Sequence, residues 1–144
     1  MADKTNPPVW FWIVAGIAFI WNALGVNAYV ETVTMTEEGF AAMSAAERGL
    51  YENVPSWATA AFALAVWGGT IGSLGLLLRR AFTYYILILS LLGIIVQLIY
   101  NVFMSQSMDV YGPGPALVMP MMVLIIGVLL VWLARFAKSK QWIV

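Results

Sequence analysis

The fold is decided by residues 57–104, "WATAAFALAVWGGTIGSLGLLLRRAFTYYILILSLLGIIVQLIYNVFM". Two apolar runs, Trp57–Leu78 and Phe82–Met104, flank the basic pair Arg79–Arg80. Each run has about 22 residues, or about 33 Å of helix, against a hydrocarbon core of about 30 Å. The link between them is too short for anything but a tight turn. The stretch therefore predicts two antiparallel transmembrane helices joined as a hairpin.

Two further runs, Val9–Val30 and Ala116–Phe136, have the same length and character. The whole chain is 62% hydrophobic and only 10% charged, with a mean hydropathy of +0.89, whereas a soluble domain has about 25% charged residues. We expect an all-α integral membrane protein whose partner is the lipid bilayer. Residues 1–144 should form one domain, an antiparallel four-transmembrane-helix bundle in up-down-up-down order.

The long polar link at residues 31–54 separates the first two runs. Ser44 is followed three residues later by Glu47, which is the spacing of a capping box at a helix N-terminus. Apolar and acidic residues alternate around that position at helical intervals. We expect one or two short helices here, forming an extracytoplasmic cap over the bundle.

The basic residues indicate the orientation of the bundle. With four spans, all of them except Arg48 fall on one side of the membrane, and all of the acidic residues except Asp3 fall on the other. Because Lys and Arg accumulate on the cytoplasmic side of membrane proteins, both termini are predicted to be cytoplasmic. Lys4 and the Arg79–Arg80 turn would then lie on the same inner face.

Composition excludes several kinds of function. The chain has no Cys and no His, so thiol catalysis, disulfides, zinc sites and the usual haem ligands are absent, and no catalytic residue, metal or cofactor is predicted. A formal net charge of zero gives no reason to expect a nucleic-acid partner. No ionisable residue falls near the middle of a span, which argues against an ion-driven pump and against an enzyme.

Three amides stand where hydrocarbon is expected. Asn22 lies in the first run, and Gln97 and Asn101 lie one turn apart in the third. An amide in lipid without a partner costs several kcal/mol, so each must bond to another helix, to water or to a ligand. Either the amides hold the helices together, or they line an outward-facing pocket for a neutral solute. In the second case Trp21 or Trp67, both near mid-span, would stack on the solute. The two alternatives use the same residue types.

Small residues mark one run as a close-packing helix. Gly68 and Gly72 have GxxxG spacing, and Gly69 and Ser73 repeat it one residue later. Such faces let two helices approach backbone to backbone. We expect them to pack within one bundle rather than to form a dimer face.

Five segments together resemble a known family. They are "PPVWFWIV", "WNALGVNAY", "VPSWATAAFALAVWGGTIGSLGLLLRR", "VQLIYNVFMS" and "YGPG". The chain is similar along nearly its whole length to a family of small four-span bacterial proteins of the marine Bacteroidetes type, some of them labelled sugar transporter. The resemblance implies a location in the bacterial inner membrane and brings no binding residues with it.

Two functions remain open on the sequence. The first is a passive carrier or binding protein for a small neutral, sugar-like solute, with Asn22, Gln97 and Asn101 in its site. The second is a non-catalytic accessory or assembly subunit that docks a membrane partner. A bundle of 144 residues has little room for a continuous aqueous path, so a carrier of this size is expected to be a homo-oligomer.

Overall fold

A computed structural model describes residues 5–144 and confirms the predicted four-helix membrane bundle. Lys4 lies outside the described residues. Within them, four helices are long and apolar enough to cross a membrane. They are α1 (Val9–Val33), α4 (Ser56–Leu77), α5 (Thr83–Ile99) with its continuation η1 (Tyr100–Met104), and α7 (Pro113–Ser139).

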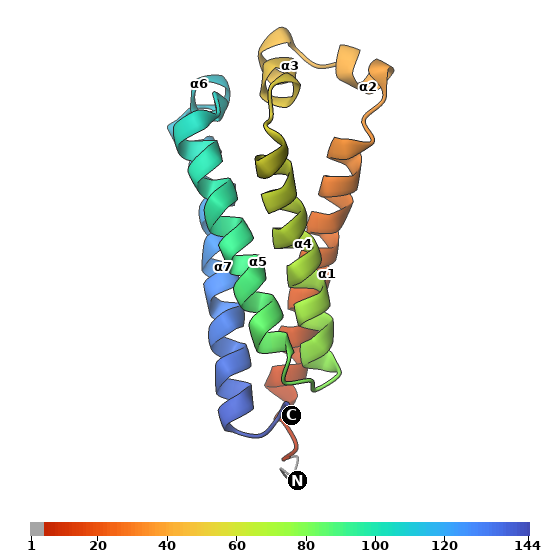
Figure 1. Cartoon of the computed structure of the whole chain (residues 1–144), viewed down its shortest axis with the longest axis vertical. Helices are drawn as coiled ribbons and strands as arrows, with labels where there is room; N and C mark the ends of the chain where they lie inside the picture. The colour runs from red at the N-terminus through yellow and green to blue at the C-terminus, as the bar shows by residue number, and fades with distance from the viewer. Residues whose placement is uncertain (1–4) are drawn as a thin grey trace.

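Three short helices lie at the end of the bundle opposite the termini (Figure 1). They are α2 (Glu37–Ala41), α3 (Ala45–Glu52) and α6 (Ser107–Tyr111). The predicted capping box starts α3: the backbone N–H of Glu47 donates to Ser44 Oγ, and the backbone N–H of Ser44 donates to the Glu47 carboxylate, both at 3.2 Å. The sequence did not predict α6, which is followed by Gly112, where φ is +85°.

The two ends of the bundle differ in charge. The end with the termini and the α4–α5 turn is here called the basic end, and the end with α2, α3 and α6 is called the acidic end (Figure 1). The basic end carries Arg79, Arg80, Arg135, Lys138 and Lys140. The acidic residues of the described chain lie at the other end, in the last turn of α1 (Glu31) and in α2, α3 and α6. The fold thus brings together the charges from which the orientation was predicted.

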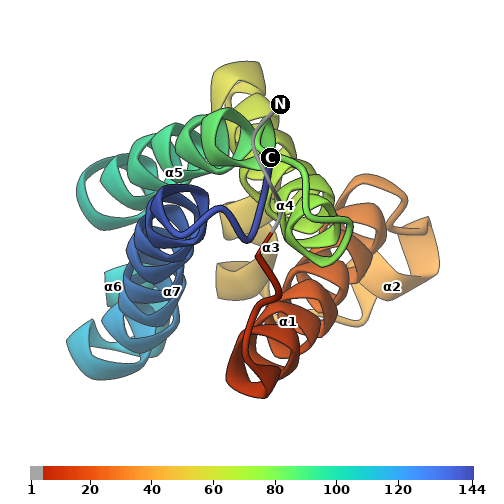
Figure 2. The ribbon, with the colours of Figure 1, turned by 90° about the horizontal axis from the view of Figure 1, so that it is seen from below.

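The four long helices pack in a curved row rather than as a closed square. α1 packs on α4, α4 on α5, and α5 on α7, so α1 and α7 are the outer members of the row (Figure 2). They come together near the basic end, where Trp10 of α1 lies with its ring centroid 6.5 Å from that of Phe136 of α7. The core follows the same pattern and is concentrated there; it comprises Phe11, Ala15, Ala18, Leu76, Leu87, Leu130, Leu133, Ala134, Ala137 and Ile143.

The small residues of α4 serve two different interfaces. A Cβ added to Gly72 would lie 2.5 Å from Leu87 of α5, and one added to Gly68 would lie 3.1 Å from Ser90 Cβ of α5. A Cβ on Gly69 would instead overlap with Asn22 Oδ1 of α1. The Ser73 hydroxyl, which is fully buried, also faces Asn22. All four predicted packing residues therefore bring helices of the same chain together.

A clasp formed by Arg79 and residues 140–144 closes the basic end. The chain turns after α4 and after α7 in the same way, with Arg79 and Gln141 in the left-handed region at φ 58° and 60°. The Arg79 Nε donates to the carbonyl of Trp142 at 2.7 Å, and the backbone N–H of Val144 donates to the carbonyl of Arg79 at 3.1 Å. Ile143 is 1% exposed. The C-terminal residues thus cover the bottom of the bundle.

Candidate functional site

An inner cavity of about 460 Å³ lies between α1 and α7, backed by α4 and α5. It exists because α1 and α7 diverge from their contact at the basic end. Most of its wall is apolar, and its floor lies at Leu87 and Leu130, two members of the core. Trp21, Asn22, Gln97 and Asn101, four of the five predicted ligand-binding residues, line this one cavity.

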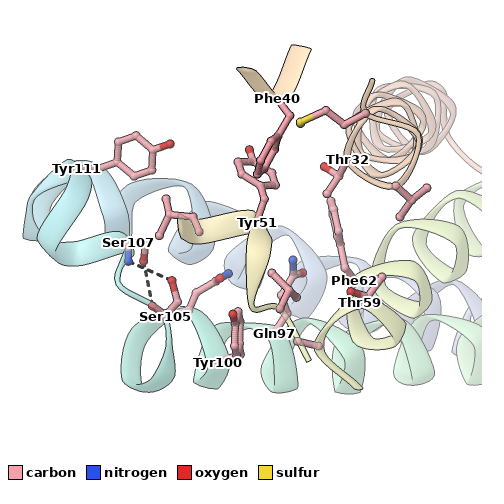
Figure 3. Close-up of a pocket in the computed structure, with 16 residues that line it drawn as sticks. Thr32, Phe40, Tyr51, Thr59, Phe62, Gln97, Tyr100, Ser105, Ser107 and Tyr111 are labelled. Carbon is pink, nitrogen blue, oxygen red and sulfur yellow. Dashed lines mark hydrogen bonds between the residues drawn. The ribbon is translucent and has the colours of Figure 1, made fainter. Parts of the chain in front are cut away.

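An outer cavity of about 680 Å³ lies beneath the cap. Figure 3 shows Phe40 and Tyr51 of the short helices entering it from one side, and Gln97 and Tyr100 of the third span from the other. Its wall is richer in hydroxyl groups than that of the inner cavity. They belong to Thr32, Tyr51, Thr59, Tyr100, Ser105, Ser107 and Tyr111.

The two cavities meet at three residues. Phe62, Gln97 and Asn101 line both of them. Gln97 and Asn101 are one helical turn apart, so both amides project from the same side of the third span. The junction thus consists of two amides and an aromatic ring, with a hydroxyl-rich space on one side and an apolar space on the other.

Asn22 has a packing role in this structure. Its Nδ2 donates to the carbonyl of Ala18 at 2.8 Å and lies 3.4 Å from Ser73 Oγ. Its Oδ1 occupies the space that a side chain at Gly69 would fill. The Asn22 amide is therefore already committed to the contact between α1 and α4, although it also borders the inner cavity.

Gln97 and Asn101 are in a different situation. Among residues 5–144, neither side-chain amide has a hydrogen-bond partner, and both are partly exposed to the cavities. The backbone carbonyl of Asn101 does accept a bond from Ser107 Oγ at 3.0 Å, which holds the start of α6 against the third span. Two amides with free donors and acceptors thus face the cavity junction.

The backbone at Asn101 is also unusual. The third span widens into the π-helix η1, where the N–H of Ser105 donates to the carbonyl of Tyr100 at 2.8 Å. Wide turns of this kind occur often at functional sites, because they change the direction in which side chains project. No pattern in the sequence pointed to it.

The structure separates the two mid-span tryptophans. Trp21 borders the inner cavity, whereas Trp67 lines neither cavity and is 45% exposed. The reason is helical geometry: Ala65 and Val66 of α4 face the cavity, and Trp67 is rotated by about 100° from Val66. A stacking role in this site is therefore open to Trp21 and not to Trp67.

Both cavities are uncharged. None of the described residues that line them is Asp, Glu, Lys or Arg, and the described chain has no cluster of side chains able to hold a metal ion. Partial burial raises the pKa of Tyr111 above its usual value. Electrostatic repulsion from the ionised forms of Glu47 and Tyr51 raises this pKa further, by smaller amounts. The Tyr111 phenol therefore stays neutral at physiological pH. The arrangement suits a neutral ligand that both donates and accepts hydrogen bonds.

Sequence reasoning missed two parts of the site. One is the wall that α7 contributes, including Pro120 and Val123, and the other is the set of cap residues such as Phe40 and Tyr51. Apolar residues in a span and aromatic residues in a link carry no signal that distinguishes a cavity wall from a lipid-facing or solvent-facing position. No protein-family model, curated protein or solved structure matched the chain.

Proposed function

We propose that this protein binds, and passively carries, a small neutral, sugar-like solute that enters from the acidic end. The observation that supports this most strongly is the pair of free amides, Gln97 and Asn101, at the junction of two uncharged cavities. An amide donates two hydrogen bonds and accepts two, which matches the hydroxyl groups of such a solute. Cavities of this size are in the range of small-molecule sites, about 300–1,000 Å³.

The lining favours a neutral solute over a charged one. A charged group that leaves water for such a cavity loses several kcal/mol of hydration, and no oppositely charged residue stands in either lining to compensate. Neutral hydroxyl groups, in contrast, find partners in Gln97, Asn101 and the hydroxyls of the outer cavity. The same neutrality argues for passive movement, since coupling to protons or sodium requires an ionisable residue on the path.

Passage across the membrane requires the basic end to open. In this conformation the way out is closed by the core around Leu87 and Leu130 and by the clasp beneath it. We therefore assign the structure to the conformation that is open toward the acidic end. We further propose that the basic end faces the cytoplasm of a bacterial inner membrane, as the distribution of Lys and Arg predicts. One chain supplies residues from all four long helices to the inner cavity, so the site needs no residue from a second copy, and the homo-oligomer stays a prediction.

Liposome swelling in iso-osmotic glucose tests the proposal. Liposomes with the wild-type protein should swell faster than protein-free liposomes, and the double variant Gln97→Leu, Asn101→Leu should return to the protein-free rate. Asn27→Leu is the matched control, because Asn27 is an exposed amide of α1 that lines neither cavity. If the double variant swells as fast as the control, the amides do not carry the solute.

The wild type, the double variant and the control are also tested over a panel of neutral sugars and polyols. If none of the three proteins makes liposomes swell faster than protein-free liposomes, the result counts against a carrier. Equilibrium binding of the same solutes then separates a binding protein from the other function kept open by the sequence. An absence of both binding and swelling would favour the accessory or assembly subunit.

A further inference from the structure

We infer that the ligand is a neutral amphipath, with a hydroxyl-bearing head in the outer cavity and an apolar tail in the inner one. This rests on the proposed function and specifies its substrate class. The inference comes from the change in wall chemistry along the site. Hydroxyl groups surround the outer cavity, amides stand at the junction, and aliphatic side chains dominate the inner cavity.

A bare sugar fits only one part of this site. Beyond Gln97, the inner wall offers Ile94, Ile126 and Leu130, none of which can bond to a hydroxyl. Each hydroxyl buried there without a partner would cost about 1–3 kcal/mol. An alkyl chain in the same place loses nothing, because it exchanges one apolar environment for another. The inner cavity is therefore suited to a tail and unsuited to a second polar ring.

The packing of the long helices supplies an entry for such a tail. α1 and α7 are the outer members of the row, and no other long helix of residues 5–144 lies between them on the side away from α4 and α5 (Figure 2). Leu24 of α1 and Met119 of α7, which both line the inner cavity, are 63% and 58% exposed. They border an opening that faces hydrocarbon in a bilayer. A tail can pass through it sideways without leaving an apolar environment.

The head must be neutral for the reason already given for the solute. The outer cavity has no charged residue in its lining, so it offers no partner for the phosphate of an ordinary phospholipid. Five tyrosine and threonine hydroxyls, with the two amides of the junction, instead match a head that carries several hydroxyl groups. These observations distinguish the ligand from bulk membrane lipid. The hydroxyl groups are those of Thr32, Thr59, Tyr51, Tyr100 and Tyr111.

Cysteine protection tests the two halves of the ligand separately, because the chain has no cysteine of its own. Thr59→Cys reports on the outer cavity and Val123→Cys on the inner cavity. Leu89→Cys is the control, since Leu89 is 50% exposed and lines neither cavity. The rate of reaction with N-ethylmaleimide is measured in lipid nanodiscs with methyl β-glucoside, octyl β-glucoside below its micellar concentration, or octanoate.

We expect octyl glucoside to slow the reaction at least threefold at both reporter positions and to leave Leu89→Cys unchanged. Methyl glucoside should protect only Thr59→Cys, at a concentration at least tenfold higher. Octanoate, which has a tail of similar length and a charged head, should protect neither position. The double variant Gln97→Leu, Asn101→Leu, combined with either reporter, should lose the protection by octyl glucoside.

One outcome is that both glucosides protect Thr59→Cys at equal concentration while Val123→Cys stays unprotected. This outcome would refute the amphipathic ligand and leave the carrier proposal standing. Protection of Leu89→Cys to the same degree as Val123→Cys would also refute it, because the alkyl chain would then be acting through the bilayer. If neither glucoside protects Thr59→Cys, a glucose-like head does not bind, and the proposed function itself is contradicted for this class of solute.

Discussion

Gly93 of α5 lies against the backbone of α4, the other central helix, and Gly93→Ala tests the packing there. An added Cβ would lie 2.8 Å from the backbone carbonyl oxygen of Ala61, 3.0 Å from the backbone nitrogen of Ala65, and 3.2 Å from Leu64 Cβ. The first two are backbone atoms of α4, which cannot rotate away as a side-chain tip can. The variant folds only if α4 and α5 move apart by a few tenths of an ångström.

The expected loss of stability follows from three contributions. Overpacking of this kind costs about 1–3 kcal/mol. Separation of the helices also lengthens the hydrogen bond that Ser90 Oγ donates to the carbonyl of Ala65, now 2.6 Å, and such bonds are worth about 0.6 kcal/mol on average in membranes. The higher helix propensity of alanine returns up to about 1 kcal/mol. Taken at their full values, these contributions give a net destabilisation of about 0.6–2.6 kcal/mol.

The assay is unfolding in mixed micelles by titration with SDS, followed by far-ultraviolet circular dichroism. Gly16→Ala is the matched control: Gly16 is in α1, and no heavy atom lies within 4 Å of its added Cβ. Only helix propensity changes at that position. The free energy of unfolding of Gly16→Ala should therefore equal that of the wild type or exceed it by up to about 1 kcal/mol. Equal stability of Gly93→Ala and Gly16→Ala would refute the close contact between α4 and α5.

Four further predictions concern single side chains. Asn22→Leu should lower the free energy of unfolding by about 1 kcal/mol or more, because it leaves the buried Ser73 hydroxyl without its neighbour. Asn101→Leu removes no side-chain bond, so it should change the free energy of unfolding by less than about 0.5 kcal/mol in the same titration. Thr83→Val should raise the melting temperature, since the buried Thr83 Oγ1 has no hydrogen-bond partner among residues 5–144 and the replacement has the same shape. Gln141→Gly should stabilise the protein by about 0.5–1 kcal/mol by relieving the left-handed backbone; an unchanged denaturation midpoint would contradict this. Because the pKa of Tyr111 is raised, the folded state holds the phenol proton more tightly than the unfolded chain does. The contribution of Tyr111 to the free energy of unfolding is therefore complete below about pH 10 and declines above it. Stability and binding measured from pH 5 to 9 should show no step from this residue.

Much of the fold could be predicted because the deciding signals are local. Four apolar runs of spanning length, one short link between two of them and the Ser44–Glu47 capping box each act over a few neighbouring residues. The boundaries moved by only a few residues, as in α7, which begins at Pro113 instead of Ala116. Proline fits the first turn of a helix, where its missing N–H is not needed.

The site was harder to predict, because its residues acquire their roles across helices. Asn22, Gln97 and Asn101 are equivalent in sequence, being amides in apolar runs. The order of the helices distinguishes them. α1 packs on α4, so Asn22 meets Gly69 and Ser73 and is used in packing. α1 and α5 are not adjacent, so the amides of Gln97 and Asn101 face a cavity and stay free.

The sequence by itself determined that the protein is a four-span helical membrane protein with segregated charge and no Asp, Glu, Lys or Arg near the middle of a span. Hydropathy and charge are properties of each segment and need no knowledge of its neighbours. Only the tertiary structure decided that the helices form an open row, that α1 and α7 diverge around an apolar cavity, and that Trp67 lies outside it. Those features depend on the rotation and order of the helices, which small residues such as Gly93 set by allowing backbones to touch.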